Sequence, residues 1–160
     1  MMKGGMNMAS VSIRKEAPVA GAYDVVVCGG GPSGFIGAIA AARAGAKVAL
    51  IERYGFLGGM ATAGLVAPIS EFHYNGKRVI GGIPWEFVER LEQMGGAKVE
   101  YPLANVSFSP EYYKLLAQRM VLEAGVTLYL HAYLSGCEVG TNQIIEHVFY
   151  EIKNSGLEKK

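Results

Sequence analysis

A glycine-rich turn between a short apolar strand and a helix of small residues is the feature that most constrains this chain. Residues 23–28, YDVVVC, are rich in β-branched side chains and stop at a run of three glycines. Such a segment is typical of a buried parallel strand that enters a tight turn. A helix that ends at Gly45 follows, then a second strand over 48–51 and Glu52 directly after it. This order predicts a βαβ unit, and therefore an α/β fold with a doubly wound parallel sheet.

The glycines have the spacing of a dinucleotide-binding turn. Gly29, Gly31 and Gly34 stand at Gly-x-Gly-x-x-Gly positions. The first permits the turn, the second lets the backbone approach a pyrophosphate, and the third lets the helix lie close to the strand. The helix that begins near Ser33 would offer free N–H groups and the positive end of its dipole to phosphates. We expect its inner face to consist of Gly34, Gly37, Ala38, Ala41 and Ala42.

Glu52 narrows the choice of dinucleotide. It lies roughly twenty residues past the glycines, where a carboxylate can accept hydrogen bonds from both hydroxyls of an adenosine ribose. The same carboxylate repels a 2′-phosphate, so NADP is disfavoured. The residues up to this point leave FAD and NAD open.

The segment after Glu52 separates these two cofactors through a resemblance to a known family. It contains a second glycine turn, formed by Gly58, Gly59, Met60, Ala61 and Thr62. The run from residue 23 to about residue 68 resembles the FAD-dependent oxidoreductases of the glutathione-reductase-like fold, and within them the group whose second turn reads Gly-Gly-Met-Ala-Thr. The resemblance implies a Rossmann-like FAD-binding domain. It also implies an oxidoreductase in which FAD exchanges a hydride or an electron pair with a small organic substrate.

The resemblance further implies which residues bind FAD. The pyrophosphate would lie on the first turn, at Gly29, Gly31, Pro32, Ser33 and Gly34. The ribose would be held by Glu52 and Arg53, and the second turn would run past the pyrophosphate toward the flavin ring. Main-chain groups near Tyr133 and Leu134 would contact the adenine. The resemblance assigns no catalytic residue and no metal ligand.

Further elements are expected along the rest of the chain. One helix has Pro84 in its first turn and a core face of Phe87, Val88 and Leu91. The next has Ser109 as its N-cap and an apolar stripe of Tyr112, Leu115, Leu116 and Met120. A strand over 126–130 is followed by a hairpin in which 133–139 pairs with 144–152. This hairpin resembles the β-meander that interrupts FAD domains of this fold.

The predicted organisation is a disordered leader over 1–22 and the N-terminal part of an FAD-binding domain over 23–160. In the family, the meander is followed by a strand that returns to the centre of the sheet and then by a substrate domain. The sequence ends at Lys160, before such a strand, so we expect the domain to be incomplete and the chain to be part of a longer enzyme. An NAD-binding dehydrogenase domain and a truncated, non-catalytic module are the alternatives.

Composition argues against several other classes of protein. The net charge of +1 creates no field for nucleic acid or for an anionic membrane surface. The longest apolar stretch is too short to span a bilayer, and the leader carries no export signal, so cytoplasm is the expected location. With 51% hydrophobic residues the chain can build a core. Association of copies through an unpaired sheet edge is an option.

Cysteine and histidine positions suggest no redox pair and no metal site. Cys28 and Cys137 lack Cys-x-x-Cys spacing, which disfavours a disulfide reductase, and we expect both to be buried as small hydrophobic residues. The three histidines have no metal-binding spacing. His73 follows the second glycine turn, where an acid or base would be useful, but a solvent-facing loop position is the favoured interpretation.

Overall fold

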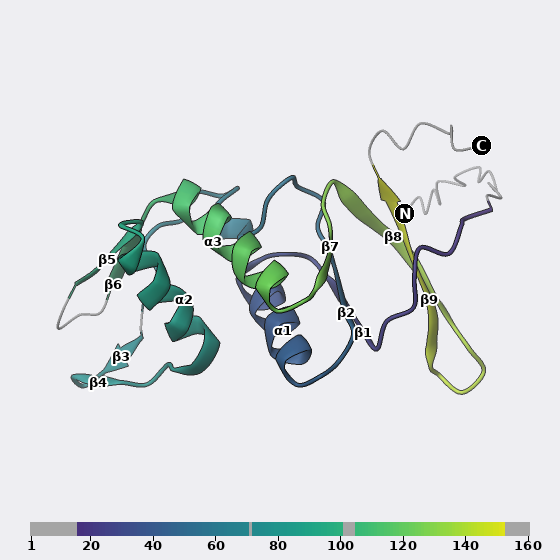
Figure 1. The fold of residues 1–160 in the computed structure, drawn as a ribbon, viewed down its shortest axis with the longest axis horizontal. Coiled ribbons are helices and arrows are strands. Elements are labelled where there is room, and N and C mark those ends of the chain that lie inside the picture. The colour runs from purple at the N-terminus through teal and green to yellow at the C-terminus, as the bar shows by residue number, and fades with distance from the viewer. Residues whose placement is uncertain (1–15, 71, 101–104, 153–160) are drawn as a thin grey trace, which may run out of the picture.

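The computed structural model describes residues 16–70, 72–100 and 105–152. Three parallel strands form the central sheet in the order β1 (Val25–Cys28), β2 (Val48–Ile51), β7 (Thr127–Tyr129). Helix α1 (Pro32–Arg43) connects β1 to β2 (Figure 1). The predicted α/β class with a parallel sheet is thereby confirmed. Of the expected leader, residues 1–15 lie outside the described residues, and 16–22 contain neither helix nor strand.

Local chemistry explains the βαβ unit. Pro32 occupies the first helical position of α1, where its fixed φ suits the helix and its missing N–H costs no hydrogen bond. Gly45, at φ +96°, ends the helix in the left-handed region. Every residue of β2 is buried, because β2 lies between its two neighbours. The expectation that β1 is buried is wrong: it forms the edge of the described sheet, so its valines are half-buried and Cys28 is exposed.

The buried face of α1 differs in part from the expected row of small residues. Ala38 is buried as expected, but Gly37 is exposed, and the largest buried side chains of the helix are Phe35 and Ile39. The Phe35 ring lies 5.2 Å from that of Phe87, centre to centre. A large side chain is required here because α1 packs against two other helices as well as the sheet.

Helices α2 (Gly82–Gln93) and α3 (Pro110–Glu123) complete the main core. The predicted face of α2 is confirmed, but the α3 stripe is only half correct. Leu116 and Met120 are buried, whereas Tyr112 and Leu115 are 43% and 51% exposed. Tyr113 turns inward instead, and its ring lies 4.6 Å from that of Phe87. The side chains buried on α3 are Tyr113, Leu116, Ala117, Met120 and Val121.

Two short hairpins between β2 and α3 were not expected from the sequence. β3 (His73–Tyr74) pairs with β4 (Lys77–Arg78), and β5 (Ala97–Glu100) pairs with β6 (Asn105–Phe108). They enclose a second, smaller core of Phe72, Trp85, Val88, Val99 and Val106. His73 is half-buried in this region, with its ring 5.8 Å from the Trp85 ring, so its assignment to a solvent-facing loop is wrong.

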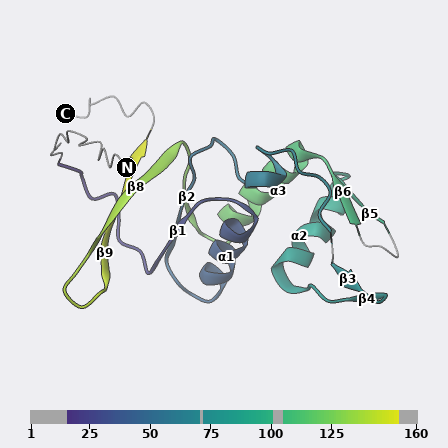
Figure 2. The ribbon, with the colours of Figure 1, turned by 180° about the vertical axis from the view of Figure 1, so that it is seen from behind.

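The predicted C-terminal hairpin is present as β8 (Ala132–Val139) and β9 (Ile145–Ile152). It lies across the sheet from α1 and α3, as both views of the fold show (Figures 1 and 2). Cys137 on β8 is exposed, as Cys28 is, so the expectation of buried cysteines is wrong for both. The reason is that one belongs to an edge strand and the other to a hairpin with mostly exposed residues. In the described part of the chain, no helix is long and apolar enough to cross a membrane.

Candidate functional site

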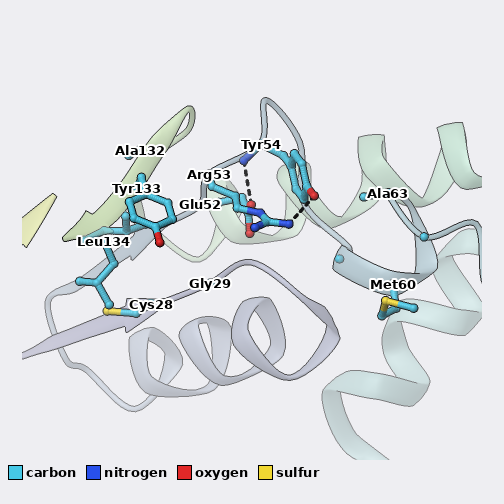
Figure 3. Close-up of a pocket in the computed structure, with 13 residues that line it drawn as sticks. Cys28, Gly29, Glu52, Arg53, Tyr54, Met60, Ala63, Ala132, Tyr133 and Leu134 are labelled. Atoms are coloured by element: carbon cyan, nitrogen blue, oxygen red, sulfur yellow. Dashed lines mark hydrogen bonds between the residues drawn. The ribbon is translucent and has the colours of Figure 1, made fainter. Parts of the chain in front are cut away.

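A pocket of about 470 Å³ opens at the carboxyl ends of β1 and β2. Open α/β sheets bind their ligands at this end of the strands. Its walls come from the end of β1, the segment after β2, the second glycine turn and the start of β8 (Figure 3). The lining residues are Cys28, Gly29, Ile51, Glu52, Arg53, Tyr54, Gly59, Met60, Ala63, Gly64, Ala132, Tyr133 and Leu134.

The two glycine turns are in direct backbone contact. The N–H of Gly58 donates a hydrogen bond of 2.8 Å to the carbonyl of Gly30. Gly59 begins the short helix η1 (Gly59–Ala61), and a Cβ at this position would lie only 2.9 Å from the Cα of Gly31. Gly58 and Gly59 also adopt φ values of +112° and +51°, which L side chains rarely adopt. The second turn therefore requires glycine for both its backbone conformation and its close contact.

The glycines of the first turn differ in what surrounds them. A Cβ on Gly34 would lie 1.9 Å from the carbonyl oxygen of Gly29, so α1 could not lie this close to the turn with any larger residue. A Cβ on Gly31 would meet no atom within 4 Å. Gly31 is also the N-cap of α1, whose first N–H groups have no partner within the helix. The turn thus leaves open space directly at a helix N-terminus.

Glu52 is a buried carboxylate at the pocket wall. Its side chain is held by main-chain donors: Oε2 accepts the N–H of Gly30 at 2.6 Å, and Oε1 accepts the N–H of Tyr54 at 2.8 Å. Only 6% of the residue is exposed. A carboxylate offers about four lone-pair positions, so these two hydrogen bonds leave acceptor capacity for hydroxyl donors on a ligand.

Arg53 is the only cation among the described residues that line the pocket. Its guanidinium lies over the Tyr54 ring at 4.6 Å from the ring centre and donates a hydrogen bond of 2.5 Å to the Tyr54 hydroxyl. Figure 3 shows this pair beside Glu52, with Tyr133 and Leu134 to its left and Met60 to its right. The site therefore has a buried anion and an exposed, stacked cation next to each other.

The structure places part of the predicted set in the pocket. Seven predicted residues line it: Gly29, Glu52, Arg53, Gly59, Met60, Tyr133 and Leu134. The predicted residues that do not line it are Gly31, Pro32, Ser33, Gly34, Gly58, Ala61 and Thr62. Thr62 is turned into the protein, where its hydroxyl donates to the Leu57 carbonyl at 2.9 Å.

Sequence reasoning did not assign several lining residues, chief among them Cys28 and Tyr54. Cys28 was assigned to the core, although it is the last residue before the glycines. Although the residue as a whole is exposed, partial desolvation of its thiol, and to a smaller extent the neighbouring Cys137, raises the pKa of Cys28 above its usual value. The neutral thiol that this favours is a poor nucleophile. The sequence feature that could have indicated Tyr54 is its position directly after Arg53, because guanidinium groups stack readily on aromatic rings.

The chain's residues fit the ADP half of a dinucleotide. The space above Gly31, the helix N-terminus beside it and the buried carboxylate of Glu52 are separate features. The first two suit a pyrophosphate, and the carboxylate suits a ribose. The pocket volume also lies in the range of about 300 to 1,000 Å³ that small-molecule sites occupy.

Comparison with solved structures shows the same fold in several enzymes. THI4 of Thermovibrio ammonificans matches with a TM-score of 0.56 at 20% identity, over 81% of this chain and 48% of that one. L-amino acid deaminase from Proteus vulgaris matches with a TM-score of 0.56 at 16% identity, over 89% and 47%. L-proline dehydrogenase from P. horikoshii gives 0.54 at 14%, over 79% and 48%. This chain thus spans about half of each of these proteins.

Sequence comparison finds shorter matches and one long one. Dihydrolipoyl dehydrogenase of Trypanosoma brucei brucei is 52% identical over 46 residues, which is 29% of this chain and 10% of that enzyme. The mitochondrial dihydrolipoyl dehydrogenase of Pisum sativum is 48% identical over 52 residues, again 10% of its length. The profile of a family described as FAD dependent oxidoreductase matches residues 24–160. The chain therefore belongs to the FAD-dependent oxidoreductase family, and its cofactor is FAD.

Proposed function

We propose that the pocket at the end of β1 and β2 binds the ADP half of FAD, and that the complete protein oxidises or reduces a small organic molecule. The observation that carries this proposal is the position of the Glu52 carboxylate. It is buried, it accepts the main-chain N–H groups of Gly30 and Tyr54, and it belongs to a residue that lines the pocket. A buried carboxylate needs such partners, and a ribose diol supplies further ones.

The proposed roles follow the position of each segment around the pocket. Residues 29–34 would hold the pyrophosphate, with residues 58–62 alongside it. Glu52 and Arg53 would hold the ribose and its surroundings, and the main chain at Leu134 would contact the adenine. When bound, FAD supplies the hydride or electron-pair transfer. The residues of this chain bind and orient the cofactor.

Replacing Glu52 with glutamine tests the proposal. The amide keeps the size of the side chain but loses the charge, and it presents an NH2 group where the structure has two N–H donors. We expect FAD binding to weaken by on the order of 2 kcal/mol, about thirtyfold. The free energy of unfolding should also fall, by about 1 to 3 kcal/mol, since a buried N–H group loses its acceptor. Isothermal titration with FAD and urea denaturation measure the two effects.

Glu123→Gln is the matched control. Glu123 is a half-exposed glutamate on α3 that pairs with Arg90 and does not line the pocket. The same chemical change there should leave the FAD titration unchanged, because Glu123 does not line the pocket. It should lower the free energy of unfolding by at most about 1 kcal/mol, because the ion pair is exposed. If Glu52→Gln binds FAD as tightly as the parent, the ribose contact lies elsewhere and the proposal loses its main support.

A further inference from the structure

Four side chains beside the pocket form a continuous series of cation–ring and ring–ring contacts. The Arg53 guanidinium lies 4.6 Å from the centre of the Tyr54 ring. The Tyr54 and Phe56 rings are stacked at 5.6 Å, with only 6° between their planes. The ammonium of Lys114 lies 4.4 Å from the centre of the Phe56 ring. We call these four residues the cation–aromatic ladder, in which each of two stacked rings also contacts a cation.

The ladder is anchored at its Lys114 end and through the backbone of Tyr54. Lys114, which belongs to α3, is held by an ion pair of 2.7 Å with Glu111. The N–H of Tyr54 donates to Glu52, and its carbonyl accepts the N–H of His131 at 3.1 Å. The backbone of Tyr54 is therefore held by His131 on one side and by the pocket carboxylate on the other. Only Arg53, at the pocket end, is exposed.

An exposed arginine in isolation would be a poor element of a binding site, because it samples many rotamers and loses that freedom when a ligand arrives. In this structure the stack on Tyr54 and the 2.5 Å hydrogen bond to its hydroxyl fix the guanidinium at the pocket wall beforehand. A cation over a ring is worth on the order of 0.5 to 1 kcal/mol at an exposed site, and a stacked aromatic pair contributes a similar amount. The ladder thus has the strength to bias the position of Arg53.

We propose that Tyr54, Phe56 and Lys114 are positioning residues, which preorganise Arg53 for contact with the nucleotide half of the cofactor. The inference rests on the proposed function, because it assigns a role within the same pocket. It extends the site from the residues that line it to Phe56 and Lys114, neither of which lines the pocket. The competing explanation is that the rings merely stabilise the loop that follows β2.

A double-mutant cycle between Phe56 and Arg53 separates the two explanations. ADP and FAD are titrated separately into the 160-residue parent, Phe56→Leu, Arg53→Met and the double variant. We expect Phe56→Leu to weaken both nucleotides about fivefold. We expect it to have less than about a twofold effect when Arg53 is already methionine, since the ladder acts through that side chain. Phe56→Tyr should restore the parent affinity, because it keeps the stacked ring.

Two further variants serve as a second test of the ladder and as a matched control. Lys114→Met removes the anchoring charge but keeps most of the side-chain length, and it should weaken ADP in the same direction as Phe56→Leu. Phe149→Leu makes the same change as Phe56→Leu on β9, outside the pocket wall, and should leave ADP binding unchanged. Circular dichroism confirms that each variant is folded before it is titrated.

The possible outcomes bear on different claims. Coupled losses with rescue by Phe56→Tyr support the positioning role. Additive losses, or an Arg53→Met variant with parent affinity, overturn it while the proposed function stands. A folded parent chain that binds neither FAD nor ADP overturns the proposed function, and the positioning role with it.

Discussion

Replacing Gly34 with alanine is expected to lower the free energy of unfolding by about 3 kcal/mol. The added Cβ would lie 1.9 Å from the carbonyl oxygen of Gly29 and 3.0 Å from its carbon. Both are backbone atoms of a tight turn, so the helix and the turn must separate by more than an ångström. Overpacking usually lowers the free energy of unfolding by about 1 to 3 kcal/mol, and a contact this short should cost at least the upper value. The gain in helix propensity of about 1 kcal/mol does not offset it. Urea denaturation followed by circular dichroism measures the loss.

Gly37→Ala is the matched control for this result. Gly37 lies in the same helix, is exposed, and would place its Cβ more than 4 Å from the atoms outside its own helical neighbourhood. Here the change in helix propensity acts alone, so the free energy of unfolding should rise by up to about 1 kcal/mol. Equal stabilities for the two variants would contradict the close contact between α1 and the Gly29 turn.

Gly31→Val is expected to abolish FAD binding without unfolding the chain. The backbone of Gly31 has φ −66° and ψ 179°, a conformation open to any residue, and its Cβ would enter empty space. The fold should therefore lose only the small difference between glycine and valine as an N-cap, about 1 kcal/mol. The same space is where we propose that the pyrophosphate lies, and a branched side chain would fill it. Titration with FAD should show no binding at concentrations that saturate the parent.

Gly31→Ala gives a graded comparison: it should bind FAD more weakly than the parent does but more tightly than Gly31→Val does. The helical signal and the denaturation midpoint of both variants should stay close to those of the parent. FAD affinity preserved in Gly31→Val would place the pyrophosphate away from the first glycine turn. Together with Gly34→Ala, this variant distinguishes a glycine required by the fold from one required by the ligand.

The βαβ unit was predictable because its signals are local. The glycine turn, the helix expected near Ser33 and the strand that ends before Glu52 each depend on a few neighbouring residues; the helix begins at Pro32 and the strand ends at Ile51. The pocket end of the sheet and the burial of Glu52 follow from that unit. The hairpin of β8 and β9 was predictable for the same reason, since a turn joins two runs with strand propensity.

The errors came from contacts between distant segments. On α3, a stripe through Tyr112 and one through Tyr113 fit the helical period almost equally well, and the ring of Phe87 on another helix selects the second. Thr62 looks like a site residue in the glycine turn, but the Leu57 carbonyl draws its hydroxyl inward. Phe56 and Lys114 meet only because α3 packs beside the loop after β2. No pattern in a single segment contains this information.

The contact between the two glycine turns has a consequence for how such sites can be altered. The N–H of Gly58 donates to the carbonyl of Gly30, and a side chain on Gly59 would collide with the backbone of Gly31. A chimera that takes only one turn from a relative would therefore place two turns in contact whose backbones are not complementary. Grafting should succeed when both turns are transferred together, so the two segments, separated by a helix and a strand, form a single transferable module.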